Sequence, residues 1–272
     1  MIRFEHVRKE YPGGTQAVQD FSLESPTGSI TVLVGSSGCG KTTLLRMVNR
    51  MVDPSAGRVF IDDTDVASRD PVELRRSIGY VMQSGGLMPH KTVSENIQTV
   101  QKLRGVTPAL RLARVDELMA TVGLDRELLG RYPAQLSGGQ QQRVGVARAL
   151  AVDPNILLMD EPFGALDPLV RSDLQQELLA VQQKLAKTVL FVTHDIDEAF
   201  LLGDQVVILD TGAVVIQRGT PAEILAAPAN DFVEAFIGAD RGKRALHIET
   251  RGGQRIVVDS DQRVAGRLVE GP

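Results

Sequence analysis

The chain has 272 residues, which is enough to bury a large core and close to the length at which one domain gives way to two. Its 30 basic side chains are interspersed with 34 acidic ones, so the formal net charge is -4 and nothing suggests a nucleic-acid-binding surface. Cys39 is the only cysteine, which excludes an internal disulfide framework and fits a reducing compartment.

The first residues, Met1 to Glu5, lack the apolar segment of a signal peptide. No apolar run in the chain approaches the roughly 18 residues that cross a bilayer. If this protein serves a membrane, we therefore expect it to dock onto another subunit.

Three segments near the N-terminus, residues 2–8, 16–24 and 58–61, have the pattern of short strands. Together they predict a small antiparallel β layer beside the main core. Tyr11 lies in the turn between the first two segments. It could stack on a purine base there, but a surface tyrosine in a turn is equally ordinary.

Residues 35–43 match the phosphate-binding template G-x-x-x-x-G-K-[ST] without a mismatch. The apolar run Ile30 to Val34 leads into this loop, and apolar residues at helical spacing from Leu44 to Val52 lead out. Glycines let the backbone curl around a polyphosphate, and the following helix directs N–H groups at the anion. We therefore predict nucleotide binding by Gly35, Ser36, Ser37, Gly38, Cys39, Gly40, Lys41, Thr42 and Thr43.

Two side chains of this loop have expected contacts with the nucleotide. Lys41 would reach the β- and γ-phosphates, and the Thr42 hydroxyl would hold Mg²⁺. Cys39 lies near a helix N-terminus, where a thiolate is favoured, so ATP should protect it from alkylation. A glycine-rich turn with an incidental lysine is the plain alternative, and the flanking strand and helix argue against it.

A short apolar segment from Ser77 ends at the polar residue Gln83. Ligands bind at such strand ends in open α/β sheets, although Gln83 alone is better explained as an exit residue. The sequence then changes in character. Thr107 as N-cap, Pro108 at the first helical position and Gly123 as terminator predict a complete helix. We interpret residues 84–155 as a helical insertion.

The insertion contains the sequence Leu-Ser-Gly-Gly-Gln at residues 136–140, followed by another helical pattern. Ser137 and Gln140 form a capping box, so an efficient helix start is the modest interpretation. Gly138 and Gly139, however, are poor first-turn residues if stability is the only goal, and they leave backbone N–H groups bare. We therefore predict a second anion-binding site at this helix start.

An apolar run from Asn155 to Met159 has the pattern of a buried parallel strand and ends at Asp160 and Glu161. Asp160 can bind Mg²⁺, and Glu161, on the other face of the strand, is free to orient or deprotonate a water molecule. An acidic strand-to-loop turn is the less favoured alternative. Asp167 precedes Pro168 and a helix through Leu185, so its local role is that of an N-cap.

Residues 188–192 form another buried strand pattern, which ends just before His194. A single histidine is usually structural, but this one is predicted at the same sheet edge as Asp160 and could reach a γ-phosphate. Asp195 and Glu198 suggest a capping box for the next helix. Residues 205–209 and 214–218 predict a hairpin, Thr220 to Glu223 cap a short helix, and the globular pattern fades near Gly238.

The phosphate loop, Gln83, Leu136 to Gln140, the strand that ends at Glu161, and His194 occur in the order found in ATP-binding cassette ATPases, which the chain resembles over about residues 2–238. This resemblance implies an α/β fold. It consists of a P-loop NTPase (RecA-like) core, an antiparallel β subdomain, and an α-helical subdomain inserted at about 84–155.

The resemblance also implies a use for two phosphate sites. In such ATPases two copies pack head to tail, and Ser137, Gly138, Gly139 and Gln140 of one copy close over the ATP that the other copy's loop holds. Whether this chain pairs with itself or with a paralogue stays open. Asp167 would couple the two sites, and Tyr11 would stack on adenine.

The same resemblance implies roles for the catalytic side chains. Glu161 would be the catalytic base, His194 would contact the γ-phosphate, and Lys41 would complete the catalytic set. Gln83 would sense the nucleotide and share the Mg²⁺ ion with Thr42 and Asp160. The segment after Gln83 would receive the coupling helices of a transmembrane permease.

Within the family, the chain is most similar to ATPase subunits of importers for osmoprotectants and quaternary amines such as glycine betaine, choline or proline. This narrower resemblance depends on residues 81–90, 194–200, 228–232 and 237–241. Many relatives in that group carry a tandem pair of regulatory CBS modules. We expect residues 239–272 to be a short extension without a complete pair.

The first hypothesis is therefore an ATPase on the cytoplasmic face of the inner membrane, peripheral to it. It would be bound to a permease and served indirectly by an extracytoplasmic substrate-binding protein. An importer ATPase for an amino acid or another small polar solute is the alternative. A soluble ATPase that acts on nucleic acid or ribosomes is less favoured, since tandem cassettes, a long coiled coil or a basic surface are missing. A kinase is disfavoured because Ser137 offers a second phosphate clamp instead of an acceptor site.

Overall fold

The computed structural model describes residues 1–83, 86–238, 247–251, 254–258 and 264–267. Four antiparallel strands form the first sheet, in the order β2-β1-β4-β5. Their bounds are Ile2–Tyr11 (β1), Thr15–Ser25 (β2), Ala56–Ile61 (β4) and Thr64–Asp65 (β5). The antiparallel layer expected at residues 2–8, 16–24 and 58–61 is therefore confirmed, with somewhat longer strands.

Six strands form the second sheet, in the order β10-β9-β3-β8-β7-β6. Their bounds are Ile30–Gly35 (β3), Gly79–Val81 (β6), Ile156–Asp160 (β7), Thr188–Thr193 (β8), Gln205–Asp210 (β9) and Val214–Gly219 (β10). All pairs are parallel except the hairpin β9-β10. Because β3, β8 and β7 are parallel neighbours, their carboxyl ends meet at one edge of the sheet, which is where ligands bind in open α/β folds.

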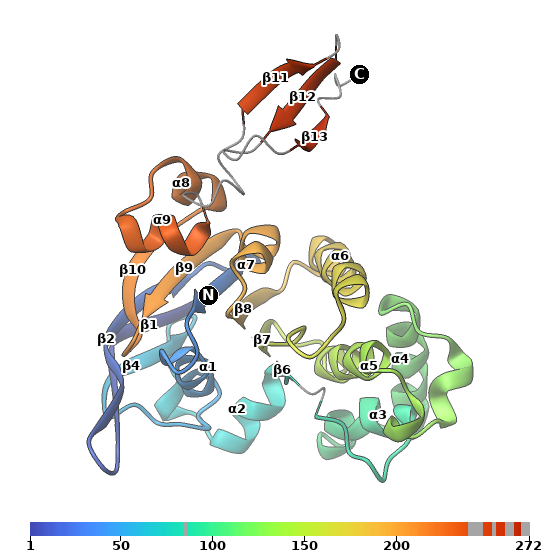
Figure 1. The fold of residues 1–272 in the computed structure, drawn as a ribbon. Coiled ribbons are helices and arrows are strands. Elements are labelled where there is room, and N and C mark those ends of the chain that lie inside the picture. Colours follow the sequence, from blue (N-terminus) through green and yellow to red (C-terminus); the bar gives the residue numbers. More distant parts are fainter. Residues whose placement is uncertain (84–85, 239–246, 252–253, 259–263, 268–272) are drawn as a thin grey trace.

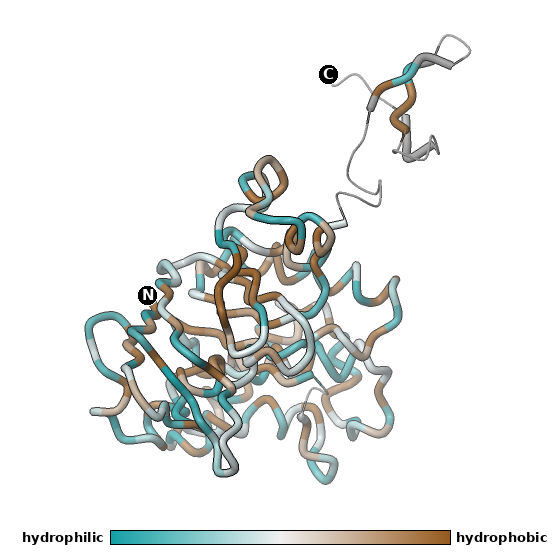
Figure 2. The backbone as a smooth tube through the Cα atoms, turned by 60° about the vertical axis from the view of Figure 1, so that its left-hand side comes forward, coloured by the Kyte–Doolittle hydropathy of each residue, from teal (hydrophilic) through white to brown (hydrophobic). Residues whose placement is uncertain are grey.

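The strand β3 is buried along its whole length and separates two hydrophobic clusters. Val32 and Val34 belong to a cluster with residues of α3 to α9, whereas Leu33 belongs to a cluster with α1 and the first sheet. This alternation follows from the two-residue period of a strand. Helix α1 thus lies between the two sheets (Figure 1), and hydrophobic stretches gather in the interior of the fold (Figure 2).

Nine α-helices occur in the described residues. Their bounds are Lys41–Val48 (α1), Pro71–Ser77 (α2), Val93–Leu103 (α3), Pro108–Thr121 (α4), Gly138–Leu150 (α5), Pro168–Leu185 (α6), Ile196–Leu202 (α7), Pro221–Ala226 (α8) and Asp231–Ile237 (α9). Short 3-10 helices span Val66–Ser68, Arg126–Gly130 and Pro133–Gln135. None of the nine helices is both long enough and apolar enough to cross a membrane.

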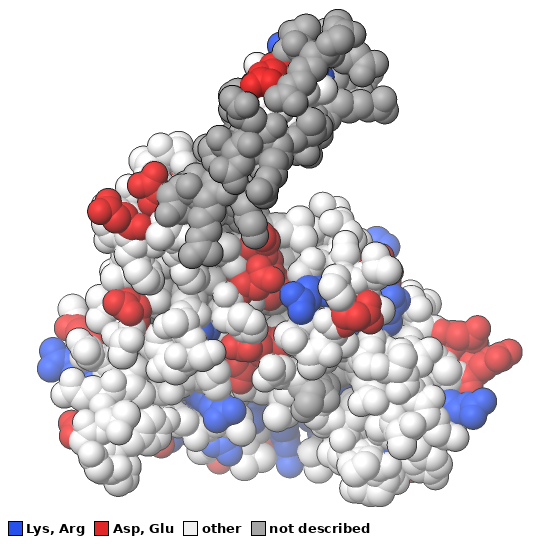
Figure 3. Space-filling model, in the orientation of Figure 1, with Lys and Arg blue, Asp and Glu red and all other residues white. Residues whose placement is uncertain are grey.

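Between β6 and β7 the described chain contains only helices and loops, with α3, α4 and α5 packed against one another. At the other end of the chain, β11 (His247–Arg251), β12 (Gln254–Val258) and β13 (Val264–Arg267) pair in a three-stranded antiparallel sheet. The remaining residues of 239–272 lie outside the described part. On the face drawn in Figure 3, acidic and basic side chains are interspersed.

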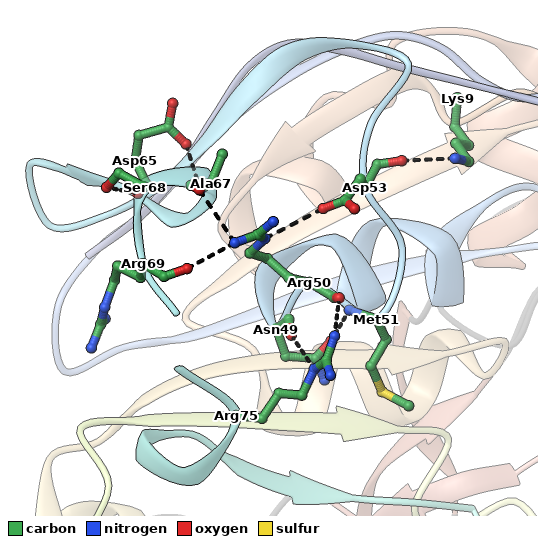
Figure 4. Close-up of polar contacts among 10 residues, drawn as sticks. All are labelled: Lys9, Asn49, Arg50, Met51, Asp53, Asp65, Ala67, Ser68, Arg69 and Arg75. Atoms are coloured by element: carbon green, nitrogen blue, oxygen red, sulfur yellow. Dashed lines mark hydrogen bonds and ion pairs between the residues drawn. The ribbon is translucent and has the colours of Figure 1, made fainter. Parts of the chain in front are cut away.

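The helix after the phosphate loop is shorter than its apolar pattern suggests, because it ends at Val48 and leaves Val52 outside. Asn49 is its C-cap, and Arg50 adopts a left-handed conformation with φ of 56°. The guanidinium of Arg75, from α2, donates to the backbone carbonyls of Asn49 and Arg50 (Figure 4). A long-range contact therefore satisfies two carbonyls that directly follow the helix end.

Two further local predictions are wrong. The strand before Gln83 begins at Gly79, because α2 continues through Ser77. The capping box of α7 is incomplete: Asp195 accepts from the backbone N–H groups of residues 197 and 198, but Glu198 does not return the bond. The Glu198 carboxylate is buried and accepts a 2.9 Å hydrogen bond from Gln175 of α6 instead.

Candidate active site

The phosphate loop connects the end of β3 to the start of α1, as its glycine pattern predicts. Neighbouring backbone leaves no room for side chains at two of its glycines. A Cβ at Gly35 would lie 2.3 Å from the carbonyl oxygen of Leu209, and one at Gly40 would lie 2.4 Å from that of Ala17. Gly40 also has φ of 111°, which favours glycine. The Ala213 N–H donates to the Cys39 carbonyl at 2.7 Å and supports the loop from the β9-β10 hairpin.

The Lys41 side chain curls back over its own loop and is almost fully buried. Its Nζ donates to the carbonyl oxygens of Gly35 at 2.7 Å and Ser36 at 2.8 Å. The ammonium group therefore lies at the centre of the loop, where it would meet an anion that the loop N–H groups hold.

The expectation that the Cys39 thiol faces the nucleotide is wrong, whereas nucleotide binding by the loop backbone at this position stays a prediction. The Cys39 side chain is 1% exposed and belongs to the hydrophobic cluster beneath the loop. Its sulfur lies 3.7 Å from the Lys41 ammonium, on the protein side of that group. The loop therefore directs its thiol into the core and not toward a bound nucleotide.

The first carboxylate at the end of β7 joins the loop directly. Thr42 Oγ1 donates to Asp160 Oδ1 at 2.8 Å, and the hydroxyl of Tyr80 donates to Asp160 Oδ2 at 3.1 Å. Burial, followed by the negative charge of Asp160, raises the pKa of Tyr80 to about 12, so the phenol remains a donor at neutral pH. Arg46 lies 3.9 Å from the same carboxylate oxygen.

The adjacent hydroxyl and carboxylate oxygens of Thr42 and Asp160 fit Mg²⁺, which prefers oxygen ligands and binds through few protein groups together with phosphate oxygens and water. No group of three or more His, Cys, Asp or Glu side chains that could hold a metal occurs in the described part of the chain. This donor set therefore suits a metal that arrives with a phosphate ligand.

The second carboxylate is turned away from the first. Glu161 has φ of 46°, and its N–H donates to the carbonyl of Val192 at 2.9 Å. Its Oε2 lies 3.0 Å from Nδ1 of His194, which follows the end of β8. The two side chains that sequence reasoning placed at one sheet edge are therefore in hydrogen-bond contact.

A pocket of about 170 Å³ lies in front of the loop. Its lining consists of Ala17, Ser37, Gly38, Gly40, Lys41, Thr42, Thr43 and Glu161. The pocket thus joins the phosphate loop to the carboxylate that could deprotonate a water molecule. Among the described residues, Ser137 to Gln140 and Asp167 are not part of this lining.

Gln83 is exposed, in the turn that follows β6. Its Nε2 would lie 3.3 Å from a Cβ placed on Gly164, so the amide is beside the segment that follows Glu161. Gln142 of α5 donates to the carbonyl of Met82 at 3.5 Å. Gln83 therefore lies close to both the acidic strand end and helix α5.

The helix start at Ser137 has the predicted capping box. Ser137 Oγ accepts from the N–H of Gln140 at 3.2 Å, and Gln140 Oε1 accepts from the N–H of Ser137 at 2.9 Å. Ser137 and Gly138 are exposed, whereas Gly139 is buried. The exposed serine and bare backbone do not line the protein's own pocket, so this helix start is open to a ligand or to another molecule.

Two further candidates have clear local surroundings. Asp167 caps α6, because its Oδ1 accepts from the N–H of Val170 at 3.1 Å. Tyr11 lies at the end of β1, and its ring centroid is 5.2 Å from the Lys9 ammonium. Tyr11 is 37% exposed and does not line the described pocket, so a purine contact stays a prediction.

Sequence reasoning missed Ala17, Tyr80 and Ala213. Ala17 lines the pocket and places its carbonyl beside Gly40, and Ala213 supports the loop through its N–H, so neither leaves a side-chain signal. Tyr80 could have been noticed, since it is the polar-tipped residue in a short apolar strand next to β7. A buried tyrosine hydroxyl usually has a hydrogen-bond partner.

Comparison with known proteins adds to this geometry. The sequence profile of the family described as ABC transporter matches residues 18–164. A dimeric ATP-binding cassette in a post-hydrolysis state, bound to ADP and inorganic phosphate, is 33% identical, with a TM-score of 0.74 over 81% of this chain and 99% of that one.

Curated relatives are more similar in sequence. The carnitine transport ATP-binding protein OpuCA of Listeria monocytogenes is 54% identical over 89% of this chain and 60% of its own length. The choline transport ATP-binding protein OpuBA of Bacillus subtilis is 52% identical over 89% and 63%. The glycine betaine uptake system ATP-binding protein YehX of Escherichia coli is 50% identical over 92% and 81%. The chain thus spans less than two thirds of the length of the first two relatives.

Proposed function

Because this chain belongs to the ABC transporter family, we propose that it binds and hydrolyses ATP to energise a membrane importer for osmoprotectants of the quaternary-amine type. The main support for ATP hydrolysis is the contact between Glu161, which lines the pocket of the phosphate loop, and His194. The names of the relatives, which refer to carnitine, choline and glycine betaine, support the solute class.

The proposed reaction uses the side chains in the pocket. Lys41 and the loop N–H groups bind the phosphates, and Glu161 accepts a proton from water as the water attacks the γ-phosphorus. The bond from this phosphorus to the bridging oxygen breaks, which gives ADP and inorganic phosphate. His194 holds the Glu161 carboxylate through Nδ1, and its other ring edge is available to the γ-phosphate. Mg²⁺ held by Thr42 and Asp160, with Gln83 nearby, would neutralise charge on the phosphate oxygens.

The proposal includes a second copy of the chain. Ser137 and Asp167 do not line the pocket of their own molecule, and the exposed helix start of α5 fits a phosphate that another copy holds. ATP would then join two cassettes, and its hydrolysis would release them. The dimeric form of the solved cassette supports this arrangement.

We propose further that the cassette pair binds the transmembrane subunits of a permease at the cytoplasmic face of the membrane. The permease would receive solute from an extracytoplasmic binding protein. Closing and opening of the cassette pair would bias the permease between its two orientations. Relatives whose names describe import or uptake systems support this placement.

Uptake of labelled glycine betaine and choline tests the proposal, in cells that carry this chain with its permease or the Lys41→Ala variant, at low and high osmolarity. Loss of uptake with Lys41→Ala is the expected result. If uptake is unchanged while the purified variant has lost its ATPase activity, the solute assignment is wrong and the ATPase assignment survives.

A further inference from the structure

The segment from Leu166 to Arg171, which we call the bridge segment, touches the start of α5 on one side. A Cβ placed on Gly138 would lie 3.4 Å from Leu166 Cδ2, and one on Gly139 would lie only 2.5 Å from Val170 Cγ1. The first turn of α5 therefore packs directly on the bridge segment, and Gly139 is the residue that allows this approach. A displacement of the α5 start must move these side chains, because close-packed groups transmit strain.

On its other side the bridge segment touches the start of α7. The Arg171 guanidinium donates from Nη2 to the Leu166 carbonyl at 3.3 Å and from Nη1 to Asp195 Oδ2 at 3.4 Å. Figure 1 shows α6, which carries Arg171, between α7 and α5. One side chain thus ties the loop before α6 to the residue that directly follows His194.

Asp195 connects Arg171 to the backbone around His194. Its Oδ1 caps α7 by accepting from the N–H of residue 197 at 2.9 Å, and its own N–H donates to Thr193 Oγ1 at 3.0 Å. Both carboxylate oxygens are therefore in use, and the backbone on either side of His194 is fixed. A shift of Asp195 would turn the imidazole that contacts Glu161.

The hydrogen bonding of Arg171 argues that stability is not its only purpose. Its Nε is buried and has no hydrogen-bond partner in the described part of the chain. A buried donor without a partner costs stability, and such groups call for an explanation.

We propose that Arg171 is a positioning residue that transmits movement of the α5 start to His194, through the bridge segment and Asp195. This inference rests on the proposed hydrolysis of ATP at Glu161 and His194. It gives each copy a way to adjust His194 when its Ser137 engages the nucleotide of the other copy. Arg171 itself does not line the pocket in front of the phosphate loop.

Steady-state ATP hydrolysis by the full chain tests this role. Arg171→Ala should lower kcat by about tenfold to a hundredfold, the loss expected when a charged hydrogen bond acts only in the reacting state. The KM for ATP and the Tm should stay close to wild type, and Arg171→Lys should recover part of kcat. Lys184→Ala, at an exposed site in the last turn of the same helix, should leave kcat unchanged.

Two outcomes would overturn the inference while wild-type hydrolysis is intact. One is an Arg171→Ala variant with wild-type kcat. The other is a Gln175→Ala variant that loses as much kcat as Arg171→Ala when the two variants have lost the same amount of Tm. Gln175 is the matched structural control, since it joins α6 to α7 one turn further from His194. If the wild-type chain does not hydrolyse ATP, the proposed function itself is contradicted.

A double-mutant cycle tests whether Arg171 acts through Asp195. Asp195→Asn keeps an oxygen for the cap of α7 but removes the charge that Arg171 contacts. The combined Arg171→Ala and Asp195→Asn variant should be no slower than the slower single variant, because both changes break one contact. Multiplied losses in kcat would show that Arg171 does not act through Asp195.

Discussion

Glu161 Oε2 and His194 Nδ1 lie 3.0 Å apart, on residues that follow two neighbouring parallel strands. Glu161 reaches this position because its backbone leaves the strand in a left-handed conformation, with φ of 46°. Such backbone strain in a non-glycine residue is common at functional sites. The contact holds a carboxylate beside the phosphate loop, where a water molecule aligned with a γ-phosphate would meet it.

The Tyr80 hydroxyl supports the oxygen pair that would hold Mg²⁺. Because its pKa is raised to about 12, the phenol stays protonated and donates to Asp160 throughout the neutral range. Tyr80→Phe should raise the Mg²⁺ concentration for half-maximal ATPase activity by about tenfold to a hundredfold, the loss expected when a metal-ligating carboxylate loses a hydrogen bond. The effect should not vary between pH 6 and 9, and titration of activity with MgCl₂ measures it.

Tyr132→Phe is the matched control for this measurement, since Tyr132 is 46% exposed and far from Asp160 in sequence. It should leave the Mg²⁺ requirement unchanged. An identical requirement in Tyr80→Phe and wild type would show that Tyr80 does not support the metal site.

The buried thiol of Cys39 should label slowly in the native protein, with or without ATP, and rapidly in urea. Iodoacetamide labelling followed by intact mass measures this directly, because the chain has no other cysteine. Ser37→Cys in a Cys39→Ser background is the control: position 37 lines the pocket, so this thiol should label quickly and be shielded by ATP. Rapid native labelling of Cys39 that ATP blocks would contradict its placement in the core.

The buried carboxyl of Glu198 should make stability depend on pH. Burial raises the pKa of Glu198 above its ordinary value of 4.5, and the negative charge of Asp195 acts in the same direction. As pH rises above 4.5, the unfolded chain ionises first, so the free energy of unfolding falls until the folded carboxyl has also lost its proton. Glu198→Gln should therefore gain Tm relative to wild type as the pH rises above 4.5.

Differential scanning fluorimetry over this pH range provides the test. Below the ordinary pKa both folded and unfolded carboxyls are protonated, so the difference between variant and wild type should become constant there. Glu127→Gln, at an exposed carboxylate, should show no such trend. A Tm difference for Glu198→Gln that stays constant over the whole range would refute the assignment.

Features that depend on neighbouring residues could be predicted from the sequence. The glycine spacing of the phosphate loop and the capping box at Ser137 each lie within a few residues, so the pattern contains the geometry. The apolar strands that end at Asp160 and Thr193 could also be predicted, and the parallel sheet then brings their ends together.

Features that depend on distant residues could not be predicted in this way. Arg75 of another helix binds the two carbonyls that follow α1, and the Glu198 carboxylate accepts a hydrogen bond from Gln175, which lies 23 positions away. The support of the loop by Ala213 involves only backbone atoms. In each case a tertiary contact outweighs the local pattern, and no spacing rule reports it.

Replacement of Glu161 should also stabilise the ATP-bound pair. If Glu161→Gln binds ATP but does not cleave it, the two cassettes should remain joined, and sedimentation velocity should show a dimer with ATP and a monomer without it. The double variant with Lys41→Ala, which should lose the nucleotide itself, is the control. A Glu161→Gln chain that stays monomeric with saturating ATP would count against the two-copy arrangement.

ATP turnover by purified Glu161→Gln, measured together with ATP binding by the same sample, tests whether Glu161 is the catalytic base. Turnover should fall by a factor on the order of 10² to 10⁴, because a positioned base is lost, while the affinity for ATP stays close to wild type. Unchanged turnover would remove Glu161 from the role of base and would contradict the mechanism built on its contact with His194.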